Sequence, residues 1–159
     1  MYEIAVSAEF CAAHALSILG AREPVHGHNF RVVATVAGDV LDADGLLCDF
    51  HTVQETLESI LSELDNRNLD ELEPFAARNA SAENIAAYIA TELGDRLDAF
   101  LAPAASVRSV SVTEAPGCVA TYLVSKQIRP GNSRDAHEAS GHDAGGDEAV
   151  GGGASGGGS

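Results

Sequence analysis

The chain has 159 residues, of which 24 are acidic and 9 are basic, and its formal net charge is −15. This length suits one domain, and the hydrophobic content of 45% predicts a folded protein with a real core. The excess of acidic residues argues against nucleic acid and anionic membranes as partners, because both require basic surface patches.

The cysteines, the N-terminus and the apolar stretches together predict the compartment of the protein. Only Lys126 among the nine basic residues is a lysine, and the acidic bias fits a salt-rich cytoplasm and a GC-rich genome equally well. The three cysteines are odd in number and widely spaced, which does not indicate a disulfide framework. The N-terminus lacks the basic and apolar regions of a signal peptide, and no apolar stretch has transmembrane length. We therefore expect a cytoplasmic protein.

Two strands are predicted in the first part of the chain. Larger apolar residues alternate with smaller or polar ones from Tyr2 to Phe10, the period of a half-buried strand that leads to His14. Residues 15–25 contain glycine and proline and are predicted to form a loop. A second strand is expected from about His26 to Ala37.

Two helices and two more strands follow. Asp49 is a plausible N-cap for a helix whose apolar stripe consists of Val53, Leu57, Ile60, Leu61 and Leu64. Residues 65–78 are polar and predict a long loop. Ser81 is expected to cap a second helix that Pro103 ends. Residues 107–113 and 119–125 are predicted to be strands.

These elements predict the fold class. Residues 1–128 form one domain, and residues 129–159 are a tail rich in Gly, Ala, Ser and Asp that is expected to be disordered because it has almost no large apolar residues. The order ββααββ predicts an α+β fold, a four-stranded antiparallel sheet with both helices on one face. Such a sheet has open edges, so we expect a homo-oligomer.

Three histidines predict a metal site. His26 and His28 share one face of a strand, because side chains alternate with period two, and a neighbouring strand can bring His14 alongside them. Three neutral imidazoles with one open position are typical of a catalytic Zn²⁺ site. Glu23 lies three residues before the pair, close enough to serve the open position.

Several segments together resemble the family of 6-pyruvoyl-tetrahydropterin synthase and 6-carboxytetrahydropterin synthase, which has the tunnelling fold. The matching segments, in chain order, are residues 10–14, 26–29, 45–50, 64–69, 81–84 and 113–114 followed by Tyr122. The resemblance implies a homotrimer whose strands close a barrel, usually paired into a homohexamer. It also implies zinc on His14, His26 and His28, and a pterin pocket between subunits in which Glu114 anchors the ring.

The chain departs from this family at two positions. Arg22 stands where the usual member has a catalytic cysteine, four residues before His26. The usual Asp-His pair reads Asp65-Asn66, so Asp65 is the one retained member of the Cys-Asp-His set. Glu23 resembles the base of a variant subgroup that makes 6-hydroxymethyl-7,8-dihydropterin from 7,8-dihydroneopterin triphosphate.

The sequence leaves several functions open. The first is carbon–carbon cleavage, a retro-aldol step that requires one base and a metal, with Glu23 and Asp65 as catalytic candidates. The second is synthesis of 6-carboxy- or 6-pyruvoyl-tetrahydropterin with Glu23 in place of the cysteine. The third is a non-catalytic protein that binds a pterin or a metal.

Overall fold

The computed structural model describes residues 1–101 and 103–125, except for the side chain of residue 98. The predicted tail at 129–159 lies outside the described residues. Two long strands, β1 (Tyr2–His14) and β4 (His26–Gly38), pair along their whole length, from Tyr2 opposite Gly38 to His14 opposite His26. The strand predictions for this part of the chain are confirmed.

The sheet has five strands in the order β5-β1-β4-β6-β7. Strands β6 (Ala105–Ala115) and β7 (Cys118–Leu123) extend the antiparallel sheet beyond β4. The two-residue strand β5 (Arg67–Asn68) runs parallel to β1 and was not predicted. The predicted four-stranded antiparallel sheet is therefore correct for the long strands, and β5 adds a short parallel edge.

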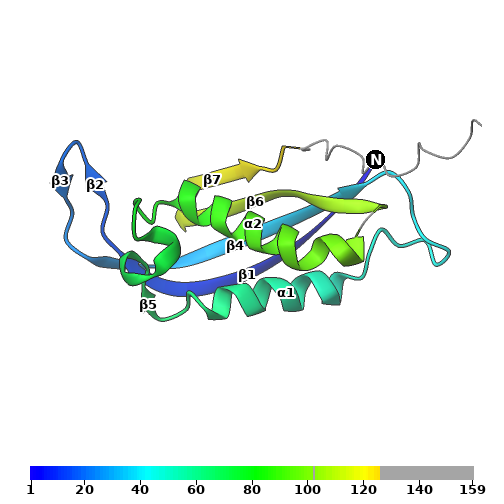
Figure 1. Ribbon diagram of the computed structural model, residues 1–159, viewed down its shortest axis with the longest axis horizontal. Coiled ribbons are helices and arrows are strands. Elements are labelled where there is room, and N and C mark those ends of the chain that lie inside the picture. The colour runs from blue at the N-terminus through cyan, green and yellow to red at the C-terminus, as the bar shows by residue number, and fades with distance from the viewer. Residues whose placement is uncertain (102, 126–159) are drawn as a thin grey trace, which may run out of the picture. The chain divides into compact units, whose positions relative to one another are not determined.

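Both helices lie on one face of this sheet (Figure 1), as predicted. Helix α1 (Phe50–Ser62) begins at the expected N-cap, where the Asp49 carboxylate accepts a hydrogen bond from the His51 amide. Helix α2 (Ala82–Leu101) follows Ser81, whose hydroxyl accepts from the Asn84 amide at 3.4 Å. Their apolar sides pack on the inner face of the sheet, and the largest fully buried side chains of this core are Phe30, Leu57, Ile60, Leu64, Leu69, Ile85, Ile89, Leu93, Leu97, Val32 and Val36.

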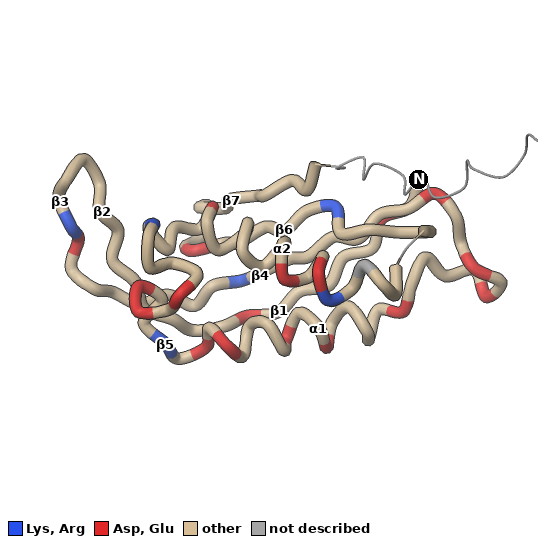
Figure 2. Tube along the Cα trace, viewed as in Figure 1, with Lys and Arg blue, Asp and Glu red and all other residues tan. Residues whose placement is uncertain are grey.

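Polar contacts on the outer side join the two helices. The Arg96 guanidinium donates to Glu63 at 2.9 Å and to Glu92 at 2.8 Å, which raises the pKa of Arg96. Acidic residues are spread along α1 and the loops, whereas Lys and Arg are few (Figure 2). No described helix combines the length and the hydropathy that crossing a membrane would need.

Two segments expected to be loops contain short elements. Residues 15–25 include a hairpin of β2 (Ser17–Ile18) and β3 (Ala21–Arg22). Residues 65–78 include β5 and two 3-10 turns, η1 (Leu69–Glu71) and η2 (Glu73–Phe75). Sequence periodicity does not reveal elements of two or three residues, because such elements are too short to show a period.

Candidate metal centre

The end of the β1–β4 pair brings the three predicted histidines together. His14 pairs directly with His26, and His28 pairs with Ala12. Because side chains on one face recur every two residues, the three imidazoles share the face that carries the buried rings of Phe10 and Phe30. The ring centroids lie 4.8 Å apart for His14 and His26, 5.2 Å for His14 and His28, and 4.9 Å for His26 and His28.

Glu114 from β6 completes this group, which we call the histidine cluster (His14, His26, His28 and Glu114). Its Oε1 atom lies 3.2 Å from His14 Nε2 and 3.2 Å from His28 Nε2. One candidate ligand atom from each of the four residues lies within 4.8 Å of the others. The structure thus brings the three predicted ligands together and adds a carboxylate to them.

Backbone carbonyls fix the orientation of two of the rings. His14 Nδ1 donates to the carbonyl oxygen of Ala80 at 2.7 Å, and His26 Nδ1 donates to that of Pro24 at 2.9 Å. A carbonyl only accepts, so the proton of each neutral ring is on Nδ1 and the lone pair is on Nε2. Such a partner on the second nitrogen is the usual arrangement behind a metal-bound histidine.

The Nε2 atoms of His14 and His28 provide a test of the metal hypothesis. Both are buried and have no hydrogen-bond partner among the described residues. A buried polar atom without a partner costs about 1–3 kcal/mol, so such atoms call for an explanation. Burial lowers the pKa of His28, nearby His14 and His26 lower it further, and Glu114 partly opposes them. A neutral ring with a free lone pair is what a zinc ligand requires, and the residues therefore fit the ion.

Glu23 lies beside this cluster in the chain, directly after the β2–β3 hairpin. Its side chain is partly buried, and its amide donates to the carbonyl of Leu16 at 2.9 Å, which closes the base of the hairpin. Among the described residues, no hydrogen bond or ion pair joins the Glu23 carboxylate to the histidine cluster. Its catalytic role stays a prediction.

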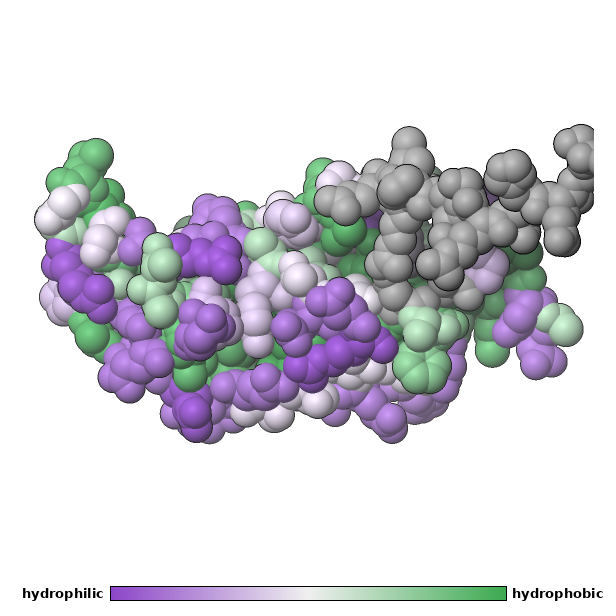
Figure 3. All heavy atoms as spheres, viewed as in Figure 1, coloured by the Kyte–Doolittle hydropathy of each residue, from purple (hydrophilic) through white to green (hydrophobic). Residues whose placement is uncertain are grey.

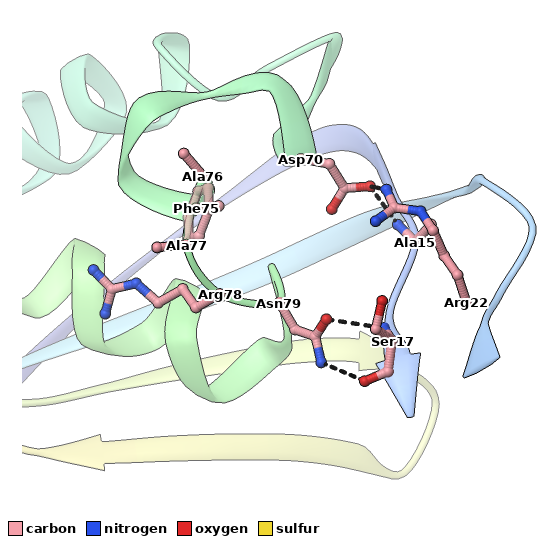
Figure 4. Close-up of a pocket in the computed structure, with 9 residues that line it drawn as sticks. All are labelled: Ala15, Ser17, Arg22, Asp70, Phe75, Ala76, Ala77, Arg78 and Asn79. Atoms are coloured by element: carbon pink, nitrogen blue, oxygen red, sulfur yellow. Dashed lines mark hydrogen bonds and ion pairs between the residues drawn. The ribbon is translucent and has the colours of Figure 1, made fainter. Parts of the chain in front are cut away.

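A polar hollow of about 290 Å³ lies where the hairpin meets the turns before α2 (Figure 4). Asp70 Oδ2 accepts from the Ala15 amide and from Arg22, both at 2.9 Å. The Asn79 side chain bonds both the amide and the carbonyl of Ser17. Arg22 therefore attaches the hairpin that directly precedes Glu23 to the rest of the domain.

Asp65 forms no hydrogen bond or ion pair with the histidine cluster in the described part of the chain. Its carboxylate accepts from the Cys11 amide and from the Asn66 side chain, each at 2.8 Å. Cys11 occupies the sheet face opposite the histidines, because it alternates with Phe10 and Ala12. Asn66 has a positive φ of 56°. Oδ1 of Asp65 therefore holds β1 to this loop and Oδ2 bonds within the loop, and the catalytic role of Asp65 stays a prediction.

Sequence reasoning missed two parts of the site, the carbonyl partners of the histidines and the position of Glu114 beside them. The carbonyls of Ala80 and Pro24 carry no side-chain signature. Glu114 was expected to anchor a pterin ring, and its position against the imidazoles was not predicted. A signal existed in the alternation of the strand, because Glu114 has the same parity as the buried Val110 and Val112 and so shares the face of the histidines.

Known proteins match the chain over this whole domain. The family model described as 6-pyruvoyl tetrahydropterin synthase matches residues 3–124. The 6-pyruvoyl tetrahydrobiopterin synthase of Drosophila melanogaster is 30% identical over 120 residues, which are 72% of this chain and 69% of that protein. The dihydroneopterin monophosphate aldolase of Pyrococcus furiosus is 33% identical over 90 residues, 57% of this chain and 73% of that protein.

A solved structure has the same fold. The 6-pyruvoyltetrahydropterin synthase of Plasmodium vivax is 25% identical, with a TM-score of 0.66 over 76% of this chain and 96% of that one. The Plasmodium protein has also been solved with substitutions at a glutamate described as a catalytic residue.

Proposed function

Since the chain belongs to the 6-pyruvoyl tetrahydropterin synthase family, we propose that it is a zinc-dependent lyase that cleaves the side chain of a phosphorylated 7,8-dihydroneopterin to give 6-hydroxymethyl-7,8-dihydropterin. The triphosphate is the proposed substrate. The observation that carries the proposal is the histidine cluster, with two buried Nε2 atoms that lack a partner among the described residues. These atoms are explained by a cation that they would both bind.

Two departures from the usual family residues favour cleavage over the pyruvoyl-forming reaction. Arg22 stands at the position of the usual cysteine and pairs with Asp70, and Asn66 stands at the position of the usual histidine. Neither an arginine nor an amide exchanges a proton near neutral pH. The chain therefore lacks two members of the proton-transfer set and keeps the base that cleavage requires. The similarity to the Pyrococcus aldolase supports the same reaction.

The cleavage proceeds with balanced atoms and without a redox partner. Glu23 takes the proton from the hydroxyl on the second side-chain carbon, whose oxygen becomes a carbonyl. The bond between the first and second side-chain carbons breaks, and its electron pair moves to the first carbon, where conjugation with the dihydropterin ring stabilises it. That carbon then takes up a proton, and a phosphorylated glycolaldehyde leaves. A bound zinc ion would supply a Lewis acid for the side-chain oxygens.

We also propose that the protein is a homotrimer or a homohexamer. Strand β7 is a sheet edge, and Val119 and Leu123 on it are 57% and 63% exposed. The opposite edge, β1, is covered by β5 only at Ala12 and Ala13. Edges of this kind pair readily between copies, and exposed apolar surface gathers at the tip of the β2–β3 hairpin as well (Figure 3). Light scattering that shows only monomer at micromolar concentration would contradict this proposal.

Product analysis tests the reaction. The zinc-loaded protein is incubated with 7,8-dihydroneopterin triphosphate and, in parallel, with the monophosphate, and the pterin products are separated by chromatography. We expect 6-hydroxymethyl-7,8-dihydropterin and an equal amount of phosphorylated glycolaldehyde. Formation of 6-pyruvoyl- or 6-carboxytetrahydropterin would contradict the proposed reaction, and binding without turnover would favour a non-catalytic protein.

A further inference from the structure

We infer that Glu114 is a fourth metal ligand in the substrate-free protein and that it leaves the metal when a pterin ring binds. The displacement rests on the proposed function, because that function supplies the pterin ring as the ligand. The carboxylate would then occupy the fourth coordination position in the substrate-free protein. Its departure would leave that position open for the substrate.

The distances from Glu114 to two of the imidazoles match those between ligands on one ion. Ligand atoms about 2.0–2.1 Å from zinc at a tetrahedral angle lie about 3.3 Å from each other. Glu114 Oε1 lies 3.2 Å from both His14 Nε2 and His28 Nε2. The carboxylate oxygen thus lies at the ligand-to-ligand spacing of a tetrahedral zinc site from each of these two nitrogens.

A hydrogen bond does not explain the approach of Glu114 to His14. Because His14 Nδ1 gives its proton to the Ala80 carbonyl, the neutral ring presents a lone pair at Nε2 to the carboxylate. Two electron-pair donors at this distance repel each other unless a cation lies between them. The absence of a hydrogen bond to either Nε2 atom among the described residues agrees with this reading.

The backbone explains how Glu114 reaches the cluster. In the β6–β7 pairing, Thr113 is opposite Val119 and Ala115 is opposite Cys118, so Glu114 has no partner residue and forms a bulge. Gly117, with a φ of +83°, allows the tight turn that follows. Alternation with the buried Val110 and Val112 places Glu114 on the histidine face, and bulges are frequent beside active sites.

The two roles of Glu114 exclude each other. A carboxylate that pairs with the amino group and the adjacent N–H of a pterin uses both oxygens. Oε1 cannot make that pair while it lies in the coordination sphere between His14 and His28. Ring binding therefore draws the carboxylate off the metal, and the closed four-ligand site becomes a three-histidine site with an open position.

The resting ligand is tested by metal affinity. Co²⁺ is titrated into the metal-free wild type and into Glu114→Gln, which keeps the size of the side chain and removes the anionic ligand. We expect the Kd to rise by at least about tenfold, since loss of even an outer partner costs about 10–100-fold, and the visible Co²⁺ absorption to change. Glu55→Gln is the matched control, because it removes the same charge from an exposed site on α1 and should leave both readouts unchanged.

Wild-type affinity and an unchanged Co²⁺ spectrum in Glu114→Gln would overturn the ligand assignment. If that variant does not fold by far-UV circular dichroism, Glu114→Asp replaces it. The shorter side chain reaches the ion less well, so a weaker affinity supports the assignment and an unchanged one overturns it.

The displacement is tested with pterin itself, a ring without the hydroxylated side chain and therefore without the groups expected to reach the metal. Its addition to the Co²⁺-loaded wild type should shift the spectrum toward that of Glu114→Gln. Binding detected by pterin fluorescence without a spectral shift would overturn the displacement. Failure of pterin to bind would contradict the proposed function and the displacement together, while the affinity titration would still decide the resting ligand.

Discussion

The middle of the β1–β4 pair and its histidine end differ in how their polar groups are satisfied. Under α1 and α2, the buried surface is apolar, and polar groups at the helix margins have partners within the chain, such as Asp49 and Arg96. At the other end, His14 is fully buried, and its Nε2 atom has no hydrogen-bond partner among the described residues. The first region pairs its polar groups within the chain, whereas the second leaves a buried nitrogen without a hydrogen-bond partner in the described residues.

This difference separates two kinds of substitution. A change in the packed region should lower the stability of the protein and leave the chemistry of the site intact. A change at the histidine end should remove function and cost little folding free energy, because an unsatisfied buried nitrogen costs about 1–3 kcal/mol to keep. Each prediction below tests one side of this contrast.

The largest effect is expected at Glu23. Glu23→Gln keeps the size of the side chain and removes its basicity, and a positioned general base contributes about 10²–10⁴-fold. Turnover in the product assay should fall by that factor, while zinc content and melting temperature stay at the wild-type values. Full activity would show that the base is elsewhere, with Asp65 and His51 as the next candidates. Loss of zinc would instead show that Glu23 is a ligand.

A substitution in the packed region should lower stability and leave zinc binding unchanged. Leu57 on α1 is fully buried in the core, and Leu57→Ala should cost about 2–5 kcal/mol in the free energy of unfolding. Urea unfolding of the metal-free protein measures this cost. Zinc content per folded chain should stay unchanged. A variant that loses zinc before it unfolds would show that the two regions are coupled.

Metal binding should stabilise the histidine end specifically. Zinc at 100 times its Kd should raise the free energy of unfolding by about 2.7 kcal/mol, and a chelator should remove this gain. Metal analysis should give close to one zinc per chain in the wild type. His26→Ala should lose most of it, together with the chelator-sensitive part of the melting temperature.

His26 also provides the control for this effect. Its side chain is exposed, so without metal the free energy of unfolding of His26→Ala should lie within about 0.5 kcal/mol of the wild-type value. A full complement of zinc in this variant would exclude His26 from the site.

The long strands and the clustering of the three histidines could both be predicted from the sequence, and for the same physical reason. Alternation along residues 2–14 and 26–37 determines which side chains share a face, and this pattern is local. The strand β5 could not be predicted, because it exists through pairing with Ala12 and Ala13, more than fifty residues earlier. Alternation along β6 could have placed Glu114 on the histidine face, because it has the parity of the buried Val110 and Val112. Its distance from the imidazoles depends on how β6 pairs with β4, which is not a local signal.

The smallest effect is expected at the start of α1, where a polar group is satisfied. Asp49 accepts from the His51 amide at 2.9 Å, with further bonds from the His51 ring and the Thr52 hydroxyl. These bonds, first among them the one from the His51 amide, lower the pKa of Asp49. Asp49→Ala should therefore lower the melting temperature slightly at pH 7.

The pH dependence of this effect has a defined sign. The unfolded chain takes up its proton on Asp49 near the ordinary value of about 3.9, and the folded chain does so only at a lower pH. Between these two values the unfolded state holds more protons, so acid reduces the contribution of Asp49 to stability. The gap in melting temperature between wild type and Asp49→Ala should be constant above about pH 5 and should narrow below the ordinary pKa of Asp. Asp49→Asn, an equally good cap without a titratable group, should stay near the wild type at pH 7 and keep its advantage over Asp49→Ala in acid. A gap between wild type and Asp49→Ala that does not change down to pH 2 would show that the charged form of Asp49 is not what stabilises the helix.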